Sequence, residues 1–229
     1  MIIRSVLCPS APLLARELTG RDEPVPGLRA ACALAVARLL DAGPDVVAVV
    51  GGAAASASWA PGDRLDLASY APALRGRVPA GTAGLPLAVG LGALLLDTAG
   101  YDGPRVLRAV GEGAPADECL RLGASLAGLG ARAGLLVMGD GTARRTPKAP
   151  GHFDERAEPF DVSVEKALRS GDMAALAALD AGLARDLMAT GRAAWQVLAG
   201  ALGAAARPGE ILYSDAPFGV SYLVAVLDT

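Results

Sequence analysis

The sequence predicts an α/β protein in which a central mixed sheet carries helices on both faces. Short apolar runs alternate with longer segments whose apolar residues recur at helical spacing, a pattern typical of layered α/β sheets. The run at 45–50, Asp-Val-Val-Ala-Val-Val, is apolar without alternation, as in a strand buried on both faces. The 229 residues, 52% of them hydrophobic, suffice for a large core. No repeat or Gly/Ser-rich linker divides them, so we interpret residues 1–229 as one domain.

The elements follow one another in a regular order. The expected strands cover residues 2–7, 45–50, 105–110, 134–139, 211–213 and 220–227. The expected helices cover residues 27–40, 86–98, 115–129, 157–169, 173–179 and 183–202. In the first helix, Leu28, Ala35 and Leu39 follow helical spacing. The third begins with Asp117 and Glu118, whose charges favour a helix N-terminus.

Charge and hydropathy exclude several partners. The formal net charge of −3 provides no strong positive field for nucleic acid. Arg4 interrupts the first apolar run, and Pro9 and Pro12 follow, which leaves no room for the apolar core of a signal peptide. The longest uncharged stretch, 78–96, contains several prolines and glycines and is densely apolar only over 85–96, too short to span a bilayer. We therefore expect a cytoplasmic protein that contacts neither nucleic acid nor membrane.

The chain contains a single histidine, His152, and three cysteines, Cys8, Cys32 and Cys119. One histidine cannot supply a two-His-one-carboxylate iron site or a three-His zinc site within one chain. The cysteines lie far apart and form no CxxC motif, so neither a zinc knuckle nor a disulfide framework is predicted. No cation lies near Cys8 in the sequence to lower its pKa, so we expect a buried, inert thiol.

Two Pro/Gly-rich loops, 51–62 and 139–151, follow predicted strands. They reach the carboxyl edge of the sheet, where open α/β sheets bind ligands. The second loop carries glycines and three cations, Arg144 among them. Backbone N–H groups beside glycines and arginine forks bind anions. The same loop also fits a solvated basic turn ordered by Asp140, and the residues alone do not separate the two interpretations.

Other motifs favour ordinary structure over chemistry. Residues 111–116 match a G-x-G-x-x-A dinucleotide pattern, but Glu112 would repel a pyrophosphate there, so a tight turn is favoured. Ser125 resembles a nucleophile-elbow serine yet lies inside a predicted helix. His152 lies in a loop beside Asp154. The simpler interpretation is that the imidazole is exposed to solvent, and the alternative is that it lines a ligand site.

Several segments, taken in order, resemble one known family. They read CPSAPLL at 8–14, DVVAVVGG at 45–52, GDGTAR at 139–144, APG at 149–151, FD at 160–161, GD at 171–172, GRAAWQVL at 191–198 and YSDAPFGVSY at 213–222. Over nearly the whole chain they resemble the class III extradiol ring-cleavage dioxygenases, in the branch similar to their catalytic (B-type) subunits, with Memo-like proteins as distant relatives. The Ala- and Arg-rich composition is similar to that of proteins of this branch from high-GC bacteria. The resemblance implies a helix-flanked sheet with a cleft at its edge.

The resemblance implies that, in active members, two His and one Glu hold Fe(II). The iron binds a catechol through both hydroxyls with O2 beside it, and a further His serves as acid/base. The matching positions here lack these groups. They are Ser10 for the first ligand His, residues 51–53 for the second, Ala143 for the acid/base His, and Ala189 or Thr190 for the C-terminal ligand. Asp186, the nearest carboxylate, lies about a helical turn away. Ser or Gly cannot replace imidazole for Fe(II) with useful affinity.

We therefore expect a degenerate iron site, no cofactor, and either no catalysis or the binding of a small polar or anionic ligand in the cleft. The candidate cleft residues are Ser10, Gly52, Asp140, Thr142, Arg144 and His152. Arg144 is the strongest, because its planar fork pairs with carboxylate or phosphate bidentately. The alternatives are a ring-cleavage dioxygenase with unusual ligands, a metal-free catalyst around Cys8, Asp140 and His152, and a structural or regulatory subunit. Self-association as a homo-oligomer is compatible with any of these.

Overall fold

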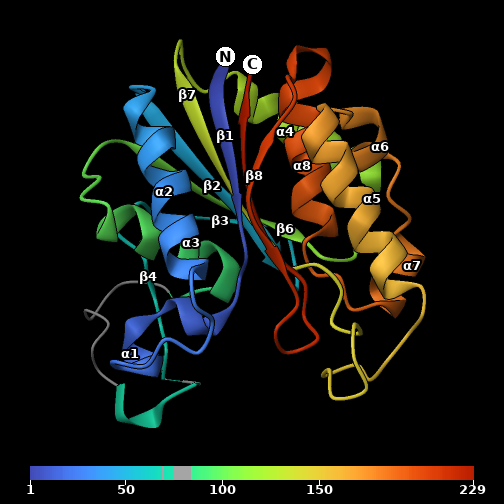
Figure 1. The fold of residues 1–229 in the computed structure, drawn as a ribbon. Helices are drawn as coiled ribbons and strands as arrows, with labels where there is room; N and C mark the ends of the chain where they lie inside the picture. The colour runs from blue at the N-terminus through green and yellow to red at the C-terminus, as the bar shows by residue number, and fades with distance from the viewer. Residues whose placement is uncertain (69, 75–83) are drawn as a thin grey trace.

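The computed structural model describes residues 1–68, 70–74 and 84–229, in which two layers of helices enclose a central sheet (Figure 1). The seven strands of the sheet run in the order β3-β6-β2-β7-β1-β9-β8. Their bounds are β1 Ile2–Cys8, β2 Val46–Ala53, β3 Ala57–Trp59, β6 Arg105–Gly111, β7 Ala133–Met138, β8 Glu210–Asp215 and β9 Tyr222–Asp228. A separate small pair consists of β4 Arg64–Leu65 and β5 Gly84–Leu85. The predicted α/β class and mixed sheet are confirmed.

The centre of the sheet is parallel and its margins are antiparallel. Strands β6, β2, β7 and β1 pair in parallel, whereas β3, β9 and β8 pair antiparallel with β6, β1 and β9 respectively. Every residue of β7 is buried, which explains its unbroken apolar run. Met138 at the end of β7 pairs with Cys8 of β1 and with Gly51 of β2. The three strands therefore end close together at one edge of the sheet.

Helices cover both faces, as predicted (Figure 1). One layer contains α1 Arg16–Thr19, α2 Leu28–Asp41 and α3 Leu87–Thr98. The other contains α4 Ala116–Ala127, α5 Ala157–Ser170, α6 Met173–Ala177, α7 Ala181–Asp186 and α8 Arg192–Leu202. Short 3-10 turns lie at Pro12–Leu14, Pro72–Leu74 and Gly203–Ala205. Within the described ranges, no helix combines the length and apolar character that crossing a membrane requires.

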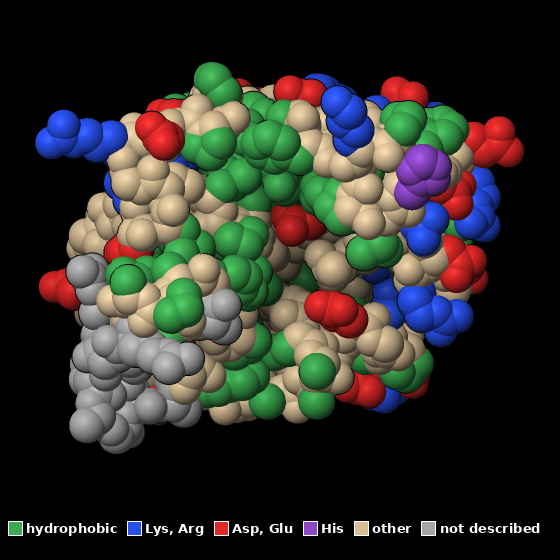
Figure 2. Space-filling view, turned by 90° about the horizontal axis from the view of Figure 1, so that it is seen from below, with side chains coloured by type: hydrophobic (Ala, Val, Ile, Leu, Met, Phe, Trp, Pro, Cys, Tyr) green, Lys and Arg blue, Asp and Glu red, His purple; other side chains and the backbone are tan. Residues whose placement is uncertain are grey.

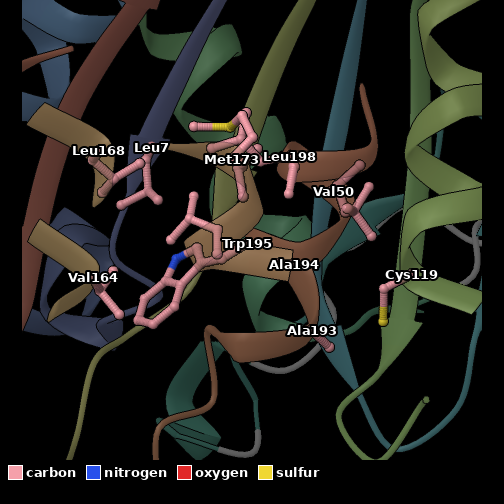
Figure 3. Close-up of a cluster of buried hydrophobic side chains, with 14 of the residues drawn as sticks. Leu7, Val50, Cys119, Val164, Leu168, Met173, Ala193, Ala194, Trp195 and Leu198 are labelled. Atoms are coloured by element: carbon pink, nitrogen blue, oxygen red, sulfur yellow. The ribbon is translucent and has the colours of Figure 1, made fainter. Parts of the chain in front are cut away.

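Helices α4 and α8 touch through their backbones. A Cβ on Gly123 of α4 would lie 2.1 Å from the Val197 carbonyl oxygen, and one on Gly200 of α8 would lie 2.3 Å from that of Leu120. Only glycine permits this approach, because any side chain would overlap the facing backbone. The contact presses α8 onto the sheet, where Trp195 and its neighbours fill the core beneath it (Figure 3).

The structure corrects two boundaries. The single helix expected over 183–202 is two helices, α7 and α8, separated at 187–191. In this break Met188 adopts a positive φ of 56°, and the Leu187 carbonyl accepts a hydrogen bond from the Ala143 N–H instead of continuing a helix. The loop expected from residue 51 begins later, because β2 continues to Ala53 in register with β6, and β3 follows inside the expected loop.

Candidate site at the carboxyl edge of the sheet

The carboxyl ends of β1, β2 and β7 meet at one face of the molecule, together with the start of β9 and the end of β8. Figure 2 views the molecule from this side and shows a hollow near the middle of the face, bordered by hydrophobic and acidic side chains. The sequence predicted a ligand site at this edge. Its polar residues come from the loops that follow these strands.

Asp140 follows β7 and is the most strongly perturbed carboxyl group of the site. Its Oδ1 accepts a hydrogen bond of 2.7 Å from the Ser10 N–H, and its backbone carbonyl accepts one of 2.8 Å from the Gly191 N–H. Part of the residue reaches the surface, but burial of the carboxyl raises its pKa to about 7, against the smaller opposing effect of the Ser10 N–H. Near neutral pH the group is therefore divided between its acidic and ionised forms.

Tyr222 lies near Asp140, and Tyr213 lies near Tyr222; sequence reasoning gave neither tyrosine a role. Tyr222 begins β9 and is buried; its pKa is raised to about 12 by burial and then by the negative charges of Asp140 and of Tyr213. Tyr213 lies on β8, and its pKa is raised by burial and by the charge of Asp215. A usable signal was their place on either side of the turn between the last two strands of the chain. Their phenols stay protonated at neutral pH.

Gly52 lies inside β2 rather than in a loop, at the point where the segment between α7 and α8 crosses the edge. A Cβ at Gly52 would lie 3.1 Å from the Thr190 carbonyl oxygen and 3.1 Å from Cγ of Glu112. A side chain there would therefore press on both neighbours. The absence of one allows the backbone of Thr190 to approach the sheet.

Thr142 is fully buried, and its polar groups bond to the protein itself. Its N–H donates to Oδ1 of Asp161 at 2.9 Å, and its hydroxyl donates to Oδ2 at 2.7 Å. The Arg145 guanidinium completes the cluster at 3.3 Å from Asp161 Oδ2. Burial still raises the pKa of Asp161, although both bonds from Thr142 and the one from Arg145 oppose it. Thr142 thus anchors the loop to α5, a role that the sequence did not indicate.

Arg144 has a different environment from Arg145. A Cβ on Gly151 would lie 2.7 Å from Cγ of Arg144 and 2.6 Å from Sδ of Met188, so the stems of Arg144 and Met188 both pack against this glycine. Its Nε is buried and has no hydrogen-bond partner in the described part of the chain. No ion pair within the same ranges involves Arg144, whereas Asp154 nearby pairs with Arg156 at 2.8 Å.

His152 and Cys8 have environments that differ from that of Asp140. His152 is exposed, with a φ of 59° and its Nδ1 2.9 Å from the Pro147 carbonyl oxygen. Cys8 is buried, and its pKa is raised well above the usual range by hydrogen bonding with the Cys32 thiol and by burial. Among the described residues no hydrogen bond links either side chain to Asp140. The predicted inert thiol fits this placement. Ser125 lies within α4 and donates to the Leu122 carbonyl, so it forms no nucleophile elbow.

The donor set at this edge does not fit the Fe(II) implied by the resemblance. The residues that the resemblance matches to metal ligands are a serine at position 10, glycine or alanine at 51–53, and alanine or threonine at 189–190. Fe(II) needs imidazole or carboxylate ligands at such positions. Asp186, the nearest alternative, lies 3.8 Å from Arg156 as an ion pair. Over residues 1–68, 70–74 and 84–229, no three His, Cys, Asp or Glu side chains gather as a metal cluster.

Comparisons with known proteins give a fold and nothing finer. No family model matches the chain, and no curated protein matches its sequence. Among solved structures, the chain is similar to an uncharacterised protein of Escherichia coli K12, JW3007, with a TM-score of 0.60 and 15% sequence identity over 99% of this chain and all of that one. At this identity the likeness establishes that the two chains share an α/β fold along their whole length.

Proposed function

We propose that this chain is a relative of the extradiol dioxygenases whose edge site binds a small polar or anionic ligand without a resident iron. The observation that carries the proposal is the convergence of the degenerate positions. Ser10 contacts Asp140, Asp140 contacts Gly191, and the adjoining Thr190 lies against Gly52. Positions that the resemblance matches to ligand residues are thus neighbours in space and lack metal donors, which supports a pocket kept for binding.

Asp140 would recognise a polar ligand through the oxygen that Ser10 does not occupy. A carboxyl group with a pKa of about 7 donates a hydrogen bond when protonated and accepts one when ionised. The Nε of Arg144 has no hydrogen-bond partner among the described residues, although the charge of Arg144 contributes to lowering the pKa of Asp154. The arginine fork would pair with a carboxylate or phosphate of the ligand. The buried Tyr222 adds a protonated phenol near Asp140.

The test combines metal content with ligand binding. Protein purified without chelator is analysed for iron and then titrated with 3,4-dihydroxybenzoate, a catechol that carries a carboxylate, by isothermal calorimetry. We expect substoichiometric iron and saturable binding that Arg144→Ala weakens roughly tenfold, in line with loss of a charged hydrogen bond. Arg121→Ala, which removes an exposed arginine on α4, serves as the control. Iron bound stoichiometrically within one chain would refute the proposal.

The ionisation of Asp140 adds a pH signature. Above pH 7 the carboxylate repels an anionic ligand, whereas below it the protonated group donates a hydrogen bond, so binding of 3,4-dihydroxybenzoate should tighten from pH 8 to pH 6. Asp140→Asn should flatten this dependence. Oxygen uptake with catechols and added Fe(II) tests the dioxygenase alternative in the same preparations, and we expect no uptake. Light scattering tests the structural or regulatory alternative.

A further inference from the structure

A second cavity lies on the α5 side of the sheet, between α5 and strands β8 and β9. Its volume is about 440 Å³, within the range of small-molecule pockets. Successive residues of a strand point to opposite faces, so Leu223 borders this cavity, whereas Tyr222 packs into the cluster of the other face. The cavity therefore lies on the face opposite the Tyr222 side chain, although Gly141 and Ser221, the chain neighbours of Asp140 and Tyr222, also border it.

Negative charge predominates around this cavity. Four carboxylates border it against one guanidinium, that of Arg145. Arg145 lies 3.0 Å from Glu158 and 3.3 Å from Asp161, so it is already shared between two of them. Glu165 accepts the Ser214 hydroxyl at 2.6 Å and pairs with Arg169. Arg169 does not border the cavity, and the balance stays negative even with it included. Carboxylate oxygens retain acceptor capacity beyond these bonds.

The wall of the cavity also includes a buried donor without an acceptor. Trp195 of α8 is 1% exposed and borders the cavity, and its indole Nε1 has no hydrogen-bond partner in the described part of the chain. Figure 3 shows the six-membered ring of the indole extending towards Val164 of α5, which borders the same cavity. An unpaired buried N–H is unfavourable, so a ligand oxygen that reaches Nε1 from the cavity would gain a hydrogen bond.

We infer that this cavity binds an organic ammonium compound that carries a carbonyl or hydroxyl oxygen. The ammonium group lies beside the carboxylates of Glu165 and Asp215, and the oxygen accepts from Trp195. The apolar part of the ligand packs on Val164 and Leu223. A metal ion does not fit as well, because no three of the acidic side chains in the described ranges gather as a metal cluster.

Leucinamide tests this inference, because it combines an ammonium group, a carbonyl oxygen and an aliphatic side chain. The titration is run at pH 6.5, where its amino group is protonated. Trp59 and Trp195 are the two tryptophans of the chain, so Trp59→Phe leaves Trp195 as the only indole reporter. We expect a saturable change in its emission with a Kd of about 1 mM or tighter, the strength available to a ligand of this size.

Matched probes and variants separate the charge from the rest of the ligand. N-acetylleucinamide keeps the carbonyl and the aliphatic group but lacks the charge, and it should bind at least tenfold more weakly. Glu165→Gln should weaken leucinamide binding about tenfold by removing one charged partner, whereas Asp117→Asn on α4 should not change it. Equal binding of the two probes, equal affinity of the two variants, or no saturable signal up to 10 mM leucinamide would overturn the inference. Arg144→Ala, which tests the edge site, leaves leucinamide binding unchanged.

Discussion

Asp140 and Asp161 are two carboxyl groups near the same edge of the sheet, and they differ in the hydrogen bonds and ion pairs that they receive. Asp161 is held by two hydrogen bonds from Thr142 and an ion pair with Arg145. Asp140 receives one backbone hydrogen bond, from Ser10, and no ion pair among the described residues involves it. Burial raises the pKa of both, and that of Asp140 reaches about 7. A buried carboxyl is thus structural where its partners compensate desolvation and chemically available where they do not.

The largest expected effect follows removal of the compensated carboxylate. Asp161→Ala leaves the Thr142 N–H, its hydroxyl and the Arg145 guanidinium without their acceptor. Breaking a buried hydrogen-bonded pair in this way should lower the free energy of unfolding by about 3 kcal/mol, measured by urea denaturation. An unchanged midpoint would show that the loop is anchored elsewhere. Asp161 would then have no structural role that sets it apart from Asp140.

Asp140→Asn should act in the opposite direction. Because the pKa of Asp140 is higher in the folded protein, about 7, than the ordinary value of 3.8, ionisation opposes folding and stability falls as pH rises between these values. The variant lacks this penalty, so it should gain about 2 kcal/mol over the parent chain at pH 8 and almost nothing at pH 4. Urea denaturation at both pH values measures the difference. An equal effect at both would mean that the carboxyl is not desolvated.

Thr142→Val isolates one bond of the compensated cluster. The substitution preserves volume but removes the hydroxyl that donates to Asp161, while the backbone N–H and Arg145 remain. The unfolding free energy should fall by about 1 kcal/mol, again measured by urea denaturation. A larger loss than for Asp161→Ala would indicate that packing of residue 142, rather than its hydrogen bond, holds the loop.

The smallest effect is expected at an exposed pair. Asp117 and Arg121 lie one turn apart on α4, and both side chains are mostly exposed. The hydrogen bond from Arg121 lowers the pKa of Asp117, yet solvent screens the pair. Asp117→Ala should therefore leave the urea midpoint unchanged within error. This variant is the baseline against which the two buried carboxyls are judged.

Local patterns predicted most of the fold. The β-branched run before Gly51 became β2, and the apolar spacing after Gly27 became α2. These patterns work because burial on one face or two imposes a period that the sequence records directly. The glycine contact of α4 with α8 was not predicted, because a close approach between helices depends on which residues face each other across a distance that no local window contains.

By itself, the sequence determined the class of fold and the edge of the sheet at which Ser10, Gly52 and Asp140 lie. The tertiary structure decided which polar residues remain available. Thr142 and Arg145 are engaged by Asp161, nineteen and sixteen residues further on, while Arg144 and Asp140 are less engaged. It also decided the interruption of the last helical segment, where Gly191 and Leu187 bond to the loop after β7. Such choices depend on partners distant in the chain, and hydrogen-bond partners of that kind leave no periodic trace in a sequence.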